Sequence, residues 1–177
     1  SKSSFGRRKV LSQLQGMGIN SGSYSWNWAS PEYTSYYTDE TGNLHIVAWK
    51  DQTLYDAVCN SVLNVTNVTT VKLPLPLWGG FYAAPDGNFY VAVGQKNLNE
   101  DNSITAVRIL KYSRAWKLLG ATDIGGGYTN MFEGIYIPFD AASLRMTQTG
   151  STLIVHTGRE MYGICLLYTS DAADDKA

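Results

Sequence analysis

The feature that most constrains the fold of this chain is a strand–turn–strand unit that occurs three times along its 177 residues. The copies read TDETGNLHIVAWK, AAPDGNFYVAVGQ and RMTQTGSTLIVHTG, and their turn glycines are Gly42, Gly87 and Gly150. Glycine supplies the positive φ of a two-residue hairpin turn without a steric cost. Each unit therefore predicts a β-hairpin with an apolar second strand. A further tight hairpin is expected where only Asp51 and Gln52 separate two strand-like runs.

The rest of the sequence continues this succession of short β-rich runs and turns. Aromatic residues make up 12% of the chain and charged residues only 16%, a balance that favours an all-β protein. We expect strands over residues 43–50, 53–58, 64–73, 79–84, 88–94, 103–113, 115–124, 143–148 and 151–158. The first two turn glycines lie about 45 residues apart, which fits propeller blades of about four strands. The sequence thus predicts an all-β fold, a partial β-propeller of repeated antiparallel hairpins, truncated at both ends.

The segment YAAPDGNFYVAVGQ, followed further on by VRILKYSRAWKLLG, resembles bacterial β-propeller repeats of the NHL-like kind. Those repeats carry a D-G-N-aromatic-Val strand, then a strand that ends near Lys-aromatic-(Asp/Ser), then a glycine. The resemblance covers residues 84–120 best, and the run QKNLNEDNSITA makes the middle loop longer than in a compact NHL repeat. It implies a binding or scaffold role toward a protein or glycan ligand, in a bacterial protein that is secreted or attached to the cell surface.

The end of the chain does not follow the strand pattern. The run CLLYTSDAADD (165–175) resembles a translated transposase adapter from sequencing libraries, and the chain opens with SKSSFGRRKV, without an initiator Met. We therefore expect residues 165–177 to be a non-native, adapter-derived tail. The expected organisation is an N-terminal segment over 1–22, a partial β-propeller over 23–164 and that tail, within an internal fragment of a longer bacterial protein.

The charge balance argues against two classes of partner. Lys and Arg number 14 and Asp and Glu number 15, so the net charge of −1 gives no electrostatic footprint for nucleic acid. No apolar run approaches the length of a membrane span.

The two cysteines, Cys59 and Cys165, do not make a disulfide framework. No nucleotide-binding or metal-binding motif occurs, so we expect no cofactor and no metal.

An aromatic run near the N-terminus is the leading candidate for ligand binding. In SYSWNWASPEYTSYY, Tyr24, Trp26 and Trp28 alternate with small polar residues, as on one face of a strand. Such a face could stack on sugar rings, and packing between blades is the structural alternative. Tyr128 joins these candidates because it lies in the long glycine-rich loop GGGYTNMFEG, and long loops in compact domains are often functional.

The loop NLNEDNS has oxygen-bearing side chains at alternate positions. These are Asn97, Asn99, Asp101 and Ser103. Oxygen ligands at this spacing can wrap Ca²⁺, but the loop lacks the central Gly and the closing Glu of an EF-hand. A solvated hairpin loop is the interpretation that the sequence favours.

Catalysis has two candidate sites. His156 and Glu160, in the motif HTGRE, could perform general acid–base work. However, both histidines of the chain, His45 and His156, lie in predicted strands, where a structural role is expected. A glycosidase pair is the second candidate, drawn from the carboxylates around the glycine-rich loop, Asp123, Glu133 and Asp140. The sequence favours a binding scaffold, with a glycoside hydrolase or lyase on a propeller, or a structural spacer, as alternatives.

Overall fold

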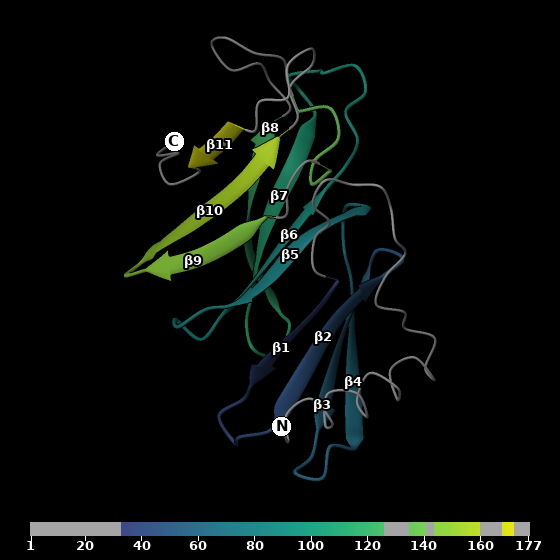
Figure 1. The fold of residues 1–177 in the computed structure, drawn as a ribbon, viewed down its shortest axis with the longest axis vertical. Coiled ribbons are helices and arrows are strands. Elements are labelled where there is room, and N and C mark those ends of the chain that lie inside the picture. Colours follow the sequence, from purple (N-terminus) through teal and green to yellow (C-terminus); the bar gives the residue numbers. More distant parts are fainter. Residues whose placement is uncertain (1–32, 126–134, 141–143, 160–167, 172–177) are drawn as a thin grey trace. The chain divides into compact units, whose positions relative to one another are not determined.

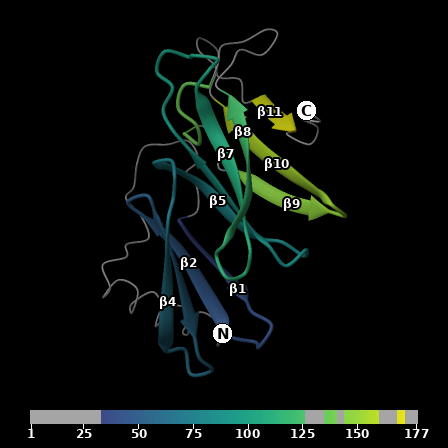
Figure 2. The same ribbon diagram turned by 180° about the vertical axis from the view of Figure 1, so that it is seen from behind.

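The computed structural model describes residues 33–125, 135–140, 144–159 and 168–171. Every regular element in these residues is a β-strand, so the all-β expectation is confirmed. The strands form three antiparallel sheets, none of which closes on itself among the described strands (Figure 1, Figure 2). The chain divides into two compact units, of which the first holds the described residues up to Leu73 and the second those from Pro74 onward.

The first unit is a four-stranded meander in which each strand pairs with the next along the chain. Its strands are β1 (Thr34–Thr38), β2 (Leu44–Lys50), β3 (Thr53–Cys59) and β4 (Val65–Lys72). One face of this sheet carries a small buried apolar cluster, made of Ile46, Ala48, Ala57 and Cys59. The opposite face of β2 and β3 carries the polar side chains of the candidate site.

The second unit begins with a meander of the same form. Its strands are β5 (Leu77–Ala83), β6 (Phe89–Gly94), β7 (Thr105–Tyr112) and β8 (Leu118–Gly125). A smaller sheet follows, in which β10 (Thr152–Arg159) lies between β9 (Arg145–Thr149) and β11 (Tyr168–Asp171). Each of the nine predicted strand runs coincides with one of the strands β2 to β10, to within about three residues at either end.

Four hairpin turns share one backbone hydrogen-bond pattern. The N–H of the first turn residue donates to the carbonyl four positions on, and the N–H of the fourth residue donates back to the first carbonyl. These turns start at Asp39, Asn60, Ala84 and Ser113. Their fourth residues, Gly42, Leu63, Gly87 and Trp116, all have positive φ. The pattern is a three-residue loop in which a type I turn precedes a left-handed residue. The expectation of two-residue turns at Gly42 and Gly87 is therefore wrong.

Two-residue turns do occur at two other places. Asp51 and Gln52 join β2 to β3 and have φ values of 49° and 60°, so the tight hairpin predicted there is confirmed. Gly150, with φ of 58°, begins the two-residue turn between β9 and β10. Turns of this length favour positive φ because their twist then matches that of the flanking strands.

An apolar cluster joins the meander β5–β8 to the smaller sheet. Its buried members are Ala84, Tyr90, Ala92, Val107, Ile109, Phe139, Leu144 and Val155. The Phe139 ring lies against two strand glycines: a Cβ atom added to Gly79 would come 2.6 Å from Phe139 Cζ, and one added to Gly94 would come 3.0 Å from Phe139 Cε2. Any side chain at these two positions would therefore displace the ring.

Part of the tail that is expected to be foreign forms a strand. Tyr168–Asp171 pairs in antiparallel register with residues 156–159 of β10. The sequence does not alternate here and predicts no strand. The open edge of a sheet presents unpaired N–H and C=O groups that can accept many extended segments. Pairing of this kind therefore needs no amphipathic pattern in the incoming strand.

Candidate functional site

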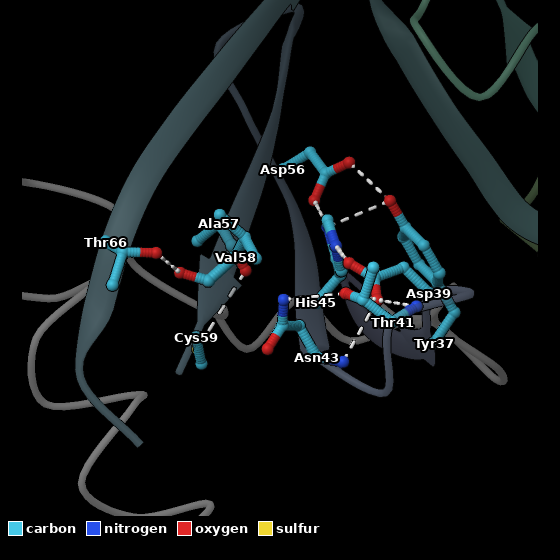
Figure 3. Close-up of polar contacts among 10 residues, drawn as sticks. All are labelled: Tyr37, Asp39, Thr41, Asn43, His45, Asp56, Ala57, Val58, Cys59 and Thr66. Atoms are coloured by element: carbon cyan, nitrogen blue, oxygen red, sulfur yellow. Dashed lines mark hydrogen bonds and ion pairs between the residues drawn. The ribbon is translucent and has the colours of Figure 1, made fainter. Parts of the chain in front are cut away.

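Four polar side chains gather on the meander β1–β4 (Figure 3). Tyr37 on β1 and His45 on β2 are direct cross-strand partners, and their rings stack with centroids 4.4 Å apart. His45 also pairs with Val58 on β3. Because side chains alternate along a strand, Asp56 lies on the same face as His45. The fourth member, Asp39, begins the turn between β1 and β2.

Hydrogen bonds connect these four side chains into one network. The Tyr37 hydroxyl donates to Asp56 Oδ2 at 2.7 Å and lies 2.9 Å from His45 Nδ1. The same Nδ1 lies 2.7 Å from Asp56 Oδ1. The other ring nitrogen, Nε2, lies 2.7 Å from Asp39 Oδ2. The imidazole of His45 is thus placed between two carboxylates that come from different segments of the sheet.

Asp39 also organises the first turn. Its Oδ1 accepts the backbone N–H groups of Thr41 and Asn43 and the hydroxyl of Thr41. Hydrogen bonds from the Thr41 hydroxyl and from His45, with those from the two N–H groups, hold the pKa of Asp39 well below its usual range, against partial desolvation. Asp39 is therefore a carboxylate at all but strongly acid pH.

This arrangement is better suited to holding strands together than to catalysis. A general base needs a ring nitrogen within hydrogen-bond reach of a substrate. Each nitrogen of His45 already faces a carboxylate oxygen at 2.7 Å. A satisfied polar network of this kind instead makes the local structure rigid. It connects β1, the first turn, β2 and β3, and we call it the His45 network.

A second polar network joins β9 to the first turn of the meander β5–β8. Gln148 donates through Nε2 to Asp86 Oδ2 at 2.9 Å and accepts the N–H of Asp86 through Oε1 at 3.1 Å. The N–H of Gln148 also donates to the Tyr82 hydroxyl at 3.1 Å, and the Tyr90 hydroxyl donates to Asp86 Oδ2 at 2.9 Å. Desolvation raises the pKa of Asp86, but hydrogen bonds from Gln148, Asn88 and Tyr90 outweigh it and lower the pKa to about 2.

Acid should weaken this second network. Because the pKa of Asp86 falls from 3.8 to about 2 on folding, its carboxylate contributes stability above about pH 4 that is lost as the pH falls through about 2. We expect the free energy of unfolding in urea to decrease on acidification, and to decrease less in Asp86→Asn. The exposed Glu40, changed to Gln, is the control and should keep the wild-type pH dependence. The same pH dependence in Asp86→Asn as in the wild type would contradict this expectation.

The aromatic residues predicted to bind a ligand lie outside the described residues. They are Tyr24, Trp26, Trp28 and Tyr128. Glu133 and Glu160, one from each catalytic hypothesis, lie outside them as well. Their roles stay predictions from the sequence.

The described members of the catalytic hypotheses have other surroundings. Asp123 on β8 accepts two hydrogen bonds from the Arg108 guanidinium, at 2.5 and 2.8 Å, which lowers the pKa of Asp123. His156 is exposed on β10, so the prediction that it lies in a strand is confirmed. Asp140 is half-buried and follows Phe139.

The loop weighed as a Ca²⁺ site uses its oxygen atoms to close its own turns. Asn97 Oδ1 accepts the N–H of Asp101, and Asp101 Oδ1 accepts both the N–H and the hydroxyl of Ser103. Asn99 is exposed, but Asn97 is only 4% exposed and its N–H donates to the carbonyl of Tyr136. The hairpin-loop interpretation therefore needs one correction, because Asn97 anchors the loop from a buried position.

Sequence reasoning assigns His45 a structural role and gives it no partners. The signal that could have found them is the length of the two turns beside β2. A three-residue loop sets Tyr37 opposite His45, and the two-residue loop at residues 51–52 sets Val58 opposite His45. Asp56 then falls on the same face. Its contacts depend on side-chain rotamers, which residue types alone do not specify.

Neither a helix able to span a membrane nor a metal-binding cluster of His, Cys, Asp and Glu occurs in the part of the chain that the structure describes. Cys59 is a buried free thiol whose pKa is raised by desolvation and by the charge of Asp56, as is typical of an unreactive structural cysteine.

Comparison of the chain with protein-family models, with curated proteins and with solved structures finds no match.

Proposed function

We propose that the chain is part of a non-enzymatic β-propeller scaffold in which each four-stranded meander is one blade. The observation that carries this proposal is the repetition of one unit. The meanders β1–β4 and β5–β8 both run in sequential antiparallel order, and both place the same three-residue turn after their first and third strands. A propeller blade is a four-stranded antiparallel sheet. On this proposal β9 and β10 are the first two strands of a further blade.

Two observations favour a scaffold over an enzyme. In the His45 network, both ring nitrogens face carboxylates of the same sheet. In the meander β5–β8, the carboxylate of Asp123 is held by Arg108. Titratable groups with partners of this kind hold strands in place and lack a free position from which to transfer a proton to a substrate.

The proposed ligand is a protein or a glycan, bound by a bacterial protein that is secreted or attached to the cell surface. This part of the proposal is supported by the resemblance of residues 84–120 to NHL-like repeats. The aromatic run is the proposed contact surface, because Tyr24, Trp26 and Trp28 can present flat apolar faces with polar edges. Tyr128 is proposed to add a further aromatic contact.

A glycan array probed with the full chain tests this function directly. We expect at least one glycan to bind the wild type, and the double variant Trp26→Ala/Trp28→Ala to bind it about tenfold or more weakly, since each stacked ring contributes about 1 kcal/mol. Tyr36→Ala is the matched control, because Tyr36 is an aromatic residue of β1 that is 65% exposed. Its affinity should stay at the wild-type value.

The same glycans show whether the chain is instead an enzyme. Every array hit is incubated with the chain and assayed for new reducing ends. Hydrolysis by the wild type that is abolished in Glu133→Gln would overturn the non-enzymatic proposal. If no glycan binds, the glycan ligand is excluded, and the aromatic pair is then tested by cross-linking to cell-surface proteins.

A further inference from the structure

His45 faces more hydrogen-bond acceptors than a neutral imidazole can serve. Nδ1 lies 2.7 Å from Asp56 Oδ1 and Nε2 lies 2.7 Å from Asp39 Oδ2, with the ring between the two carboxylates (Figure 3). An ionised carboxylate only accepts hydrogen bonds, and a neutral imidazole has a single N–H. Both contacts are hydrogen bonds at the same time only when the ring carries two protons.

The surroundings of the two carboxylates indicate which contact is lost when the ring gives up one proton. The Asp56 side chain is 6% exposed and that of Asp39 is 28% exposed. Asp39 also keeps three donors on its Oδ1, from Thr41 and Asn43. A carboxylate beside a bare nitrogen lone pair costs more free energy where water is absent. The proton on Nε2 is therefore the one that leaves.

We propose that the His45 network is a proton-operated lock on the first turn of the sheet β1–β4. With two protons on the ring, His45 donates one hydrogen bond to Asp39 in the turn and one to Asp56 on β3. The ring then holds the turn against β3. When the Nε2 proton leaves, the Asp39 contact becomes repulsive and the turn is released. This lock is a property of the sheet and does not depend on the proposed scaffold function.

The sign of the pH effect follows from the groups that face the ring. Among the described elements these are the Tyr37 phenol from β1, the Asp39 carboxylate from the turn and the Asp56 carboxylate from β3. The two carboxylates balance the charge of a doubly protonated ring. The lock is therefore closed while the ring carries two protons, and it opens as the pH rises and the Nε2 proton leaves.

Imidazole nitrogen NMR tests where the proton leaves. The chain has two histidines, so the His156→Gln variant has His45 alone. At about pH 5.5 both ring nitrogens should be protonated, and at about pH 8.5 the proton should remain on Nδ1. A free neutral histidine prefers the opposite tautomer, with the proton on Nε2. A ring that is singly protonated at the lower pH, or that keeps its Nε2 proton at the higher pH, would overturn the proposal.

Amide hydrogen exchange tests whether the turn is released. The N–H groups of Thr41 and Asn43 donate to Asp39 Oδ1. The turn at Asn60 is a matched internal control, because the N–H groups of Val62 and Asn64 donate in the same way to Asn60 Oδ1. Between about pH 5.5 and about pH 8.5, protection at Thr41 and Asn43 should fall about tenfold relative to this control pair. An unchanged ratio would show that the turn is not released.

Asp39→Asn separates a lock from a merely structural contact. An asparagine keeps an oxygen acceptor for the N–H groups of the turn, and its amide can donate to a bare Nε2. The relative fall in protection between the two pH values should therefore disappear in Asp39→Asn and persist in His156→Gln. If amide protection falls in Asp39→Asn as much as in the wild type, Asp39 does not couple the protonation of His45 to the turn.

Discussion

Replacing Gly94 by alanine is expected to lower the free energy of unfolding by about 3 kcal/mol, near the upper end of what overpacking usually costs. A Cβ atom at this position would lie 2.6 Å from the carbonyl oxygen of Ala106, 2.9 Å from Pro138 Cγ and 3.0 Å from Phe139 Cε2. The closest of these atoms belongs to the backbone of the neighbouring strand β7 and cannot rotate away. Relief of the clash would have to separate β6 from β7.

Gly120→Ala is the matched control for this variant. Gly120 lies on the edge strand β8, and a Cβ atom added there meets no other atom within 4 Å. Its effect should stay within about 0.5 kcal/mol, as for most exposed substitutions. Denaturant titration of the two variants and the wild type provides the comparison. Equal stability of Gly94→Ala and Gly120→Ala would mean that β6 and β7 are not packed as described.

Asp56→Ala is expected to lower the free energy of unfolding by about 3 kcal/mol. The Asp56 carboxylate accepts hydrogen bonds from the Tyr37 hydroxyl and from His45, and its side chain is 6% exposed. Removing it takes one of two carboxylates away from the partly buried imidazole, and leaves the Tyr37 phenol without this acceptor. Loss of one partner from a buried pair costs more than loss of one from an exposed pair, because the remaining group keeps its desolvation penalty.

Asp123→Ala supplies the exposed counterpart. Asp123, like Asp56, accepts hydrogen bonds through both of its carboxylate oxygens, here from Arg108. Its side chain, however, is 44% exposed. Its removal should cost less than about 1 kcal/mol. Urea titration at neutral pH measures both variants. A loss in Asp56→Ala no larger than in Asp123→Ala would show that the His45 network adds no stability beyond that of a surface ion pair.

Strand positions were predictable from the sequence because alternation and turn residues act locally. Nine predicted runs became strands, and the tight hairpin at residues 51–52 has the predicted form. The left-handed residues Leu63 and Trp116 could not be predicted in this way, because neither turn carries a glycine at that position. The pairing of β11 with β10 could not be predicted from the sequence either, because it depends on an open sheet edge and not on a pattern in the incoming residues.

The candidate site was less predictable than the fold. His45 and Asp56 are recognisable as a cross-strand group only after the register of β2 and β3 is known. Short catalytic and metal motifs can be recognised in a sequence because their partners are close along the chain, whereas His45 and Asp56 are eleven residues apart. The distances that define the network depend on rotamers and burial, which belong to the folded sheet as a whole.

The shared turn also bears on how chains of this kind can diverge. Its left-handed position holds glycine in two turns, whereas in a third it holds Trp116, whose ring lies 4.6 Å from that of Phe89. Aromatic contacts there offset the strain of a positive φ. The backbone path, and with it the strand register, can therefore persist when the glycine is replaced. Copies of the unit can lose the glycine that most clearly marks their periodicity and still keep the same turn.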